Sequence, residues 1–189
     1  MKHISIEGMD GVGKTTVCQL LAKKLGYQFV EKPLHYLLDK PGKVDEYRKL
    51  AKKVNADDDR TFTAWFYGLN NIYLYDKFKG KNIVTDRHIV SNYCWSGTKD
   101  NGDIYNLILK KIGKPTLTVI LYATPKAILQ RLKGRNLKDE DISKIKKSEE
   151  AYKRMISFCK NKKLPYVVVD STDKTPEEVV KYIIKYIHA

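Results

Sequence analysis

The sequence predicts a three-layer α/β/α fold around a five-stranded parallel sheet, and three observations support this fold class. Five short apolar runs are typical of buried strands. Segments with apolar residues at helical spacing separate these runs, as in strands joined by crossover helices. The 189 residues are enough to bury a substantial core as a single domain, 1–189, without metals or disulfides. The predicted strands are 4–6, 27–30, 83–85, 117–121 and 166–169.

The first strand enters a glycine-rich turn with the spacing Gly-x-x-x-x-Gly-Lys-Thr, from Gly8 to Thr15, and a helical pattern follows over 17–25. Glycines let successive backbone N–H groups point inward, so the turn and the positive end of the helix can receive phosphate oxygens. Lys14 supplies a mobile charge for the β- and γ-phosphates, and the Thr15 hydroxyl is a ligand for Mg²⁺. The turn therefore predicts a nucleoside triphosphate site.

Gly26 is expected to end the first helix, before the second strand at 27–30. Glu31 and Lys32 follow at the carboxyl edge of the predicted sheet, where they either meet a substrate or begin an ordinary charged loop. Polar residues dominate 36–60, with at most one helix near 44–54. An aromatic-rich helix is predicted over 58–78, with apolar residues on more than one face.

The third strand runs into Asp86-Arg87-His88. A carboxylate at the end of a parallel strand is well placed beside the Mg²⁺ of a nucleotide site, so Asp86 is a candidate metal ligand. His88 is expected to have a structural role. The loop is predicted to continue through 91–97, with a helix at 104–112.

The fourth strand is followed by a helix that opens at Pro125 and ends in a positive cluster. Arg131 and Arg135 are four residues apart, so they project from one face of that helix. A basic lid at about 133–144 is predicted to close over a triphosphate, the alternative being a solvated charge run. A helix at 145–158, the last strand with Asp170 at its end, and a final helix capped by Thr175 complete the chain.

Composition limits the partners and the compartment. The formal net charge of +14 suits polyanions, but the lysines are spread over many segments, so nucleic acid is not the expected partner. Three scattered cysteines suit a reducing compartment and lack metal-ligand spacing. No apolar run approaches membrane-spanning length, and no signal sequence is evident, so we expect a cytoplasmic protein without a membrane partner.

These motifs resemble, in colinear order over most of the chain, those of the thymidylate kinase family of P-loop nucleoside monophosphate kinases. The glycine-rich turn resembles the family's phosphate loop, and Asp86-Arg87-His88 with Ser91 resembles its Asp-Arg signature. The segment from Leu121 through Pro125 to Arg131 is similar to the strand and helix before the family's lid. The resemblance implies a P-loop kinase fold, and transfer of the ATP γ-phosphate to a nucleoside monophosphate, preferentially dTMP, with Mg²⁺.

The resemblance also implies roles for individual residues and a homodimer formed through the helix near 58–79. Because Gly11 stands where some members have a basic residue, the chain resembles those members that carry their catalytic cation in the lid. Arg135 is the candidate for this cation. The implied catalytic residues are Asp10, Lys14, Arg87 and Arg135. ATP would be bound by Gly8, Asp10, Gly11, Val12, Gly13, Lys14, Thr15, Thr16, Arg131, Arg135 and Asp170. The acceptor would be bound by Glu31, Phe62, Phe66, Arg87, Ser91, Trp95 and Tyr152, and the metal by Thr15 and Asp86.

Two departures from the family affect the acceptor side. Where the family has Arg-Glu-Pro-Gly-Gly-Thr, this chain begins with Glu31-Lys32-Pro33, and Phe66 replaces the arginine of a Phe-x-x-x-Arg pattern. One alternative is therefore a deoxynucleoside kinase, in which Glu31 acts as general base toward a hydroxyl. Another is a nucleotide-dependent nucleic-acid-binding protein, whose binding would weaken steeply with salt.

Overall fold

Five parallel strands form the central sheet, in the order β2-β3-β1-β4-β5. The computed structural model describes residues 1–135 and 145–187, except for the side chain of Arg135. The strands are β1 (His3–Gly8), β2 (Gln28–Glu31), β3 (Ile83–Asp86), β4 (Leu117–Tyr122) and β5 (Tyr166–Asp170). In β1, Ile6 lies opposite Asp86 on one side and Val119 on the other. The predicted fold class and all five strands are confirmed, with ends shifted by one or two residues.

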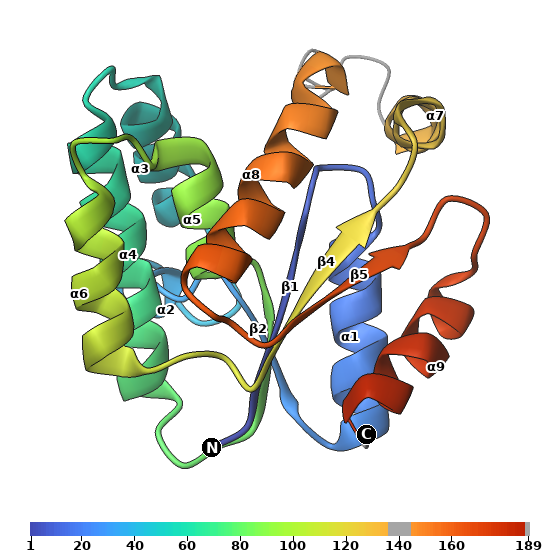
Figure 1. Ribbon diagram of the computed structural model, residues 1–189. Helices are drawn as coiled ribbons and strands as arrows, with labels where there is room; N and C mark the ends of the chain where they lie inside the picture. The colour runs from blue at the N-terminus through green and yellow to red at the C-terminus, as the bar shows by residue number, and fades with distance from the viewer. Residues whose placement is uncertain (136–144, 188–189) are drawn as a thin grey trace.

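Helices cover both faces of the sheet (Figure 1). α1 and α9 lie on one face, and α4, α5, α6 and α8 lie on the other. The helices are α1 (Lys14–Leu25), α2 (His35–Leu38), α3 (Asp45–Ala56), α4 (Arg60–Lys77), α5 (Ile89–Ser96), α6 (Gly102–Ile112), α7 (Pro125–Arg135), α8 (Ser148–Asn161) and α9 (Pro176–Ile187). No helix in the described part of the chain is long and apolar enough to cross a membrane.

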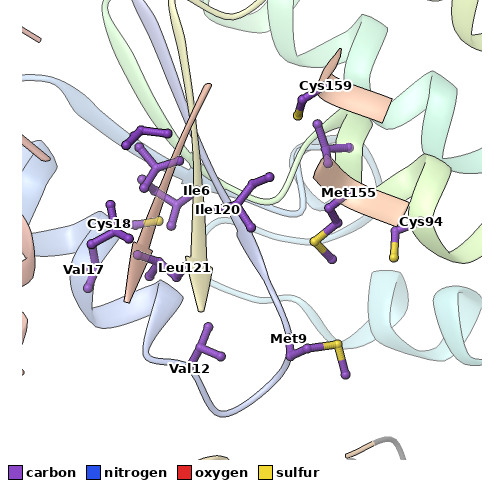
Figure 2. Close-up of a cluster of buried hydrophobic side chains, with 14 of the residues drawn as sticks. Ile6, Met9, Val12, Val17, Cys18, Cys94, Ile120, Leu121, Met155 and Cys159 are labelled. Carbon is purple, nitrogen blue, oxygen red and sulfur yellow. The ribbon is translucent and has the colours of Figure 1, made fainter. Parts of the chain in front are cut away.

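The core consists of apolar side chains on both faces of the central strands (Figure 2). Every residue of β1 is buried, as expected for a strand enclosed between two layers of helices. Cys18 lies on the α1 side of the strands, and Cys94, Met155 and Cys159 lie on the opposite side. The three cysteines are free and buried. They act as small apolar residues, as the sequence predicted.

Helix ends follow the expected local signals. Gly26 adopts a left-handed conformation with φ of 66° and donates its N–H to the carbonyls of the last turn of α1. Before α9, the Thr175 hydroxyl accepts from the Glu178 N–H at 3.3 Å, while the Glu178 carboxylate accepts from the Thr175 N–H at 2.8 Å. This reciprocal pair is a capping box, and it confirms Thr175 as the cap.

The prediction of a loop at 91–97 was wrong, because α5 occupies Ile89–Ser96. Six of its eight residues are buried, since α4 packs on one side and β1 and α8 pack on others. A helix buried on nearly all sides has no polar stripe, so its sequence lacks the amphipathic period. The four-residue α2 was also not expected. Residues 136–144 of the predicted lid lie outside the described residues.

Candidate active site

The loop between β1 and α1 follows a backbone path that only glycine tolerates at two positions. Gly8 has φ of 137°, and a Cβ added there would lie 2.4 Å from the Leu121 carbonyl oxygen. Gly11 has φ of 84°, and a Cβ there would lie 2.9 Å from Leu132 Cγ. The loop is therefore pressed against the end of β4 and against α7, with its N–H groups available at the start of α1.

Lys14 and Thr15 begin α1 and face the ends of the neighbouring strands. Lys14 Nζ donates to the Met9 carbonyl at 2.7 Å and lies 3.6 Å from Asp10 Oδ1. Burial, followed by the charge of Arg87, lowers the pKa of Lys14. The Thr15 hydroxyl donates to Asp86 Oδ2 at 2.6 Å. The two predicted metal ligands are thus adjacent.

Arg87 occupies the centre of the site in a strained backbone conformation, with φ of 73°. Its Nη2 donates to Asp10, and its Nη1 donates to the Gly8 carbonyl at 3.1 Å and to Ser91 Oγ at 3.2 Å. Burial opposes the charge, but Asp10 and Asp86 raise the pKa of Arg87 above its ordinary value. Arg87 is a fixed positive charge at the edge of the sheet.

Glu7 lies directly beneath this arginine and is fully buried. Its Oε2 accepts from the Ser91 N–H at 3.1 Å and from the Ser91 hydroxyl at 2.5 Å. Burial raises the pKa of Glu7, although these hydrogen bonds and Arg87 act in the opposite direction. Glu7 holds Ser91, and Ser91 in turn holds Arg87.

Two cavities meet at this cluster. The loop cavity, of about 530 Å³, lies over the glycine-rich turn, and the α4–α5 cavity, of about 420 Å³, lies between these two helices. Residues that line the loop cavity include Gly11, Gly13, Lys14, Thr15, Thr16, Glu31, Arg131 and Leu132. Residues that line the α4–α5 cavity include Tyr47, Asn55, Arg60, Tyr67, Asn70, Asn71, His88, Ser91, Asn92, Trp95 and Ser96. Asp10, Lys32, Asp86 and Arg87 line both cavities.

Lys32 is the second basic residue at this junction. Like Arg87 it has positive φ, in this case 45°. Its Nζ lies 2.6 Å from Glu31 Oε2, within a partly exposed ion pair. Of the described residues other than glycine, only Lys32, Arg87 and Lys163 have positive φ. Two of these three strained positions therefore face the site, which is typical of functional residues.

The structure brings some predicted site residues together and leaves others apart. Arg131 lines the loop cavity, but its Nη2 is bound to the Ser171 and Thr172 carbonyls at 2.6 and 3.0 Å. Asp170 accepts hydrogen bonds from the Thr172 N–H and hydroxyl. The Ser171 hydroxyl also donates to the Val12 carbonyl at 3.2 Å, which holds the loop after β5 against the glycine-rich turn. The side chain of Arg135 lies outside the described residues.

The residues predicted to bind the acceptor do not all line one cavity. Ser91 and Trp95 line the α4–α5 cavity, whereas Glu31 lines the loop cavity. Among the described lining residues, neither cavity includes Phe62, Phe66 or Tyr152. Phe62 is exposed on α4, Phe66 stacks on Tyr47, and Tyr152 packs against Tyr122.

Sequence reasoning missed most residues of the α4–α5 cavity. Asn70 and Asn71 come from α4, and Tyr47 comes from α3. An asparagine in an aromatic-rich helix gives no signal of what it faces, because that depends on contacts between distant segments. Lys32 had a signal, since it follows a strand at the carboxyl edge of the sheet.

The residues fit a bound Mg²⁺ through the chemistry of their donor atoms. Mg²⁺ takes oxygen ligands, and it usually binds to one or two protein groups together with phosphates and waters. The Thr15 hydroxyl and the Asp86 carboxylate offer that pair, 2.6 Å apart. Within 1–135 and 145–187, no cluster of three or more His, Cys, Asp or Glu residues forms another metal site.

Comparisons with known sequences agree on the family. A family model described as thymidylate kinase matches residues 6–183. A protein of Thermococcus kodakarensis, provisionally named adenylate kinase, is 31% identical over 97% of this chain and 84% of its own length. A thymidylate kinase of Caldanaerobacter subterraneus is 27% identical over 98% of this chain and 96% of its own length.

Solved structures support the fold. A deoxyadenosine kinase from M. mycoides with bound dATP has a TM-score of 0.64 at 19% identity, over 99% of this chain and 100% of the other. A Bacillus subtilis protein in complex with phosphorylated GDP has a TM-score of 0.60 at 23% identity, over 99% and 96%. At these identities the likeness concerns the fold alone.

Proposed function

This chain belongs to the thymidylate kinase family and is a nucleotide kinase, and from that premise we propose that it transfers the γ-phosphate of ATP to a nucleoside monophosphate. In this proposal, ATP occupies the loop cavity and the monophosphate occupies the α4–α5 cavity. The observation that carries the proposal is that Asp10, Lys32, Asp86 and Arg87 line both cavities. A phosphoryl group passing between the two nucleotides would cross this junction.

The residues at the junction are suited to positioning and to charge neutralisation, which are the main requirements of phosphoryl transfer. Lys14 would leave the Met9 carbonyl and bind the β- and γ-phosphates. Arg87, fixed by Asp10, Gly8 and Ser91, presents its positive charge to the transferring group. Thr15 and Asp86 would hold Mg²⁺, which would supply positive charge to neutralise the negative charge that develops on the transferring phosphoryl group.

Lys32 favours a monophosphate over a nucleoside as the acceptor. A nucleoside 5′-phosphate arrives with its own nucleophilic oxyanion, so it needs a cation and not a general base. Lys32 lines both cavities, whereas Glu31, the base expected in a nucleoside kinase, lines the loop cavity and is not among the residues that line the α4–α5 cavity. Glu31 is also paired with Lys32 at 2.6 Å. Both observations support the monophosphate.

For the base, dTMP is the first acceptor to test, because the family model bears that activity in its description. The provisional adenylate kinase name of the Thermococcus relative makes an adenine monophosphate the next candidate. The names of the relatives do not distinguish these two bases.

The proposal extends to assembly and compartment. Phe62, Trp65, Leu69 and Ile72 are exposed on one side of α4, at the three- and four-residue spacing of a helical stripe. We propose that a second copy of the chain covers this stripe in a homodimer, in keeping with the resemblance to a dimeric family. Free buried cysteines suit a reducing compartment, and we propose the cytoplasm.

The test is ATP consumption in the presence of Mg²⁺ and a panel of acceptors. Nucleoside monophosphates should be turned over, with dTMP and dAMP tested first, and the corresponding nucleosides should not. Turnover of nucleosides alone, lost in Glu31→Gln, would establish the nucleoside kinase instead. If no member of either panel stimulates ATP consumption, the proposed function is wrong.

A further inference from the structure

Two adjacent asparagines on α4 face the α4–α5 cavity, and they differ in their hydrogen bonds. Asn70 Oδ1 accepts from the Leu34 N–H at 2.9 Å, and its Nδ2 donates to the Tyr47 hydroxyl at 3.0 Å. Asn71 is 6% exposed, and its Nδ2 has no hydrogen-bond partner among the described residues. Asn70 therefore holds protein segments together, and the Asn71 amide donor is left for something else.

His88 presents a second set of unpaired atoms to the same cavity. It is 4% exposed, and within the described chain neither Nδ1 nor Nε2 has a partner. Its ring packs edge-on against His3 at 4.7 Å and Tyr75 at 5.8 Å between centroids. Neighbouring His3 is satisfied, by the Tyr75 hydroxyl at 2.7 Å and the Thr85 hydroxyl at 2.8 Å. The lack of partners is thus specific to the histidine that lines the cavity.

Asn71 and His88 line the same cavity, and Tyr75 is a neighbour of both. Tyr75 follows Asn71 by one helical turn, so the two share a side of α4, and the Tyr75 ring contacts His88. Ser96, whose buried hydroxyl also lacks a partner in the described residues, lies two turns beyond His88 along α5. Among the described residues, the cavity is therefore lined by unpaired polar atoms from α4, from His88 and from α5.

Unpaired buried polar groups destabilise the folded state, and folded proteins contain few of them. Several within one cavity indicate a surface kept ready for a polar ligand. Apolar side chains such as Leu74 line the same cavity. An aromatic ring with hydrogen-bonding groups on its edge matches such a lining, and a nucleobase is that kind of ligand.

We propose that Asn71 and His88 recognise the base of the acceptor nucleotide, and that they determine base specificity in this chain. The inference rests on the proposed function, because it takes the α4–α5 cavity as the acceptor site. Asn71 Nδ2 donates to a ring nitrogen or carbonyl of the base. His88 supplies one donor and one acceptor from its two ring nitrogens.

The packing of His88 suits that role. Its ring is buried against His3 and Tyr75, and among the described residues neither ring nitrogen has a hydrogen-bond partner. An arginine offers donors only, whereas an amide and a neutral imidazole together offer both donors and acceptors. The base is then selected by the match between its donors and acceptors and those of Asn71 and His88, and not by charge.

The test compares Asn71→Leu with Asn70→Leu, two substitutions of the same type at adjacent positions. Binding of dTMP, dAMP, dCMP and dGMP is measured by calorimetry, together with steady-state kinetics and the melting temperature. Asn71→Leu should weaken binding of the preferred monophosphate about 10- to 100-fold and reduce the differences in affinity among the four monophosphates. The KM of this variant for ATP should be unchanged. Its melting temperature should be unchanged or higher, since no internal hydrogen bond is lost. Asn70→Leu should lower the melting temperature.

His88→Phe provides a second variant that keeps the ring packing and removes both nitrogens. This variant should also bind the preferred monophosphate more weakly and discriminate less among the four bases. The inference is overturned if Asn71→Leu and His88→Phe both retain the wild-type affinities and base ranking. Because binding is measured directly, a wild-type protein that binds a monophosphate without phosphorylating it would refute the proposed function and still test this inference. Wild-type protein that binds none of the four would overturn both.

Discussion

Lys32 and Arg87 differ in how firmly they are held at the junction of the cavities. Arg87 is fixed by Asp10, the Gly8 carbonyl and Ser91, whereas Lys32 pairs with its partly exposed neighbour Glu31. An ion pair between partly exposed groups contributes little to stability, so it is easily exchanged for another partner. The Lys32 side chain can therefore exchange Glu31 for a phosphate, while the Arg87 side chain keeps its position.

Lys32→Met should raise the KM for the acceptor monophosphate about 10- to 100-fold, because one charge-assisted contact with the phosphate is lost. The KM for ATP should change little. Lys163→Met is a matched control, since Lys163 has a similar positive φ of 50° and lines neither cavity. Equal effects of the two substitutions on acceptor KM would contradict a phosphate-binding role for Lys32.

Glu7 illustrates a residue that acts through others. It is buried under Ser91 and Arg87 and lines neither cavity. Glu7→Gln should lower kcat about 10- to 100-fold, because the Arg87 side chain loses part of its support and small misplacements are costly. The variant should remain folded, because glutamine has nearly the same shape and replaces a buried carboxyl group whose pKa burial raises. A drop in melting temperature that accounts for the lost activity would show Glu7 to be structural only.

The residues that sequence analysis identified are those whose signal is local. The spacing from Gly8 to Thr15 and the sequence Asp86-Arg87 at a strand end each lie within one short segment. Lys32 also had a local signal, because it directly follows a strand. Asn71 and His88 reach the α4–α5 cavity only because distant segments meet in the folded chain. An asparagine with two hydrogen bonds and one with an unpaired donor are identical in sequence.

At the scale of elements, α4 combines two different faces. Asn70, Asn71 and Leu74 point into the protein, and the stripe of Phe62, Trp65, Leu69 and Ile72 is exposed. The sequence predicted this helix and its excess of apolar residues correctly, but it could not assign each residue to a face. Phe62, expected at the acceptor, lies on the exposed stripe. α5 was not predicted from the sequence, because it is buried on nearly all sides and lacks an amphipathic pattern.

Trp65→Glu combined with Leu69→Glu should convert the proposed homodimer to a monomer, because two charges would be placed in an apolar contact. The molar mass, measured by light scattering after size-exclusion chromatography, should fall from twice to once the chain mass of 21.9 kDa. Leu107→Glu, which changes an exposed apolar residue on α6, serves as the control. A wild-type chain that is already monomeric would contradict the proposed assembly.

At the scale of the whole molecule, buried neutral histidines make stability depend on pH. Burial lowers the pKa of His88 from its ordinary value of 6.5 to about 3, and burial together with His88 lowers the pKa of His3. A group whose pKa is lower in the folded state contributes stability that is complete above its unfolded pKa and is lost as the pH falls toward its folded pKa. The loss should therefore begin below about pH 6.5.

From pH 7.5 to pH 5, His88 alone should cost about 2 kcal/mol in the free energy of unfolding, by proton linkage. Urea titrations at the two pH values measure this difference in the wild type and in His88→Phe. The variant should lose less stability on acidification. Glu7 titrates in the opposite sense in both proteins. Because His88 also lowers the pKa of His3, the comparison reports the titration of His88 together with its effect on His3. Equal pH dependence in the two proteins would contradict a buried neutral His88.

Phosphoryl transfer from ATP in one cavity to a monophosphate in the other can be measured by following the phosphate itself. Protein, Mg²⁺ and ATP labelled in the γ-phosphate are incubated with dTMP, or with the monophosphate that the panel prefers, and the products are separated by chromatography. Label should appear in the nucleoside diphosphate, and Lys14→Met should form no labelled diphosphate. Label found only in inorganic phosphate, or transferred only to unphosphorylated nucleosides, would contradict this proposal.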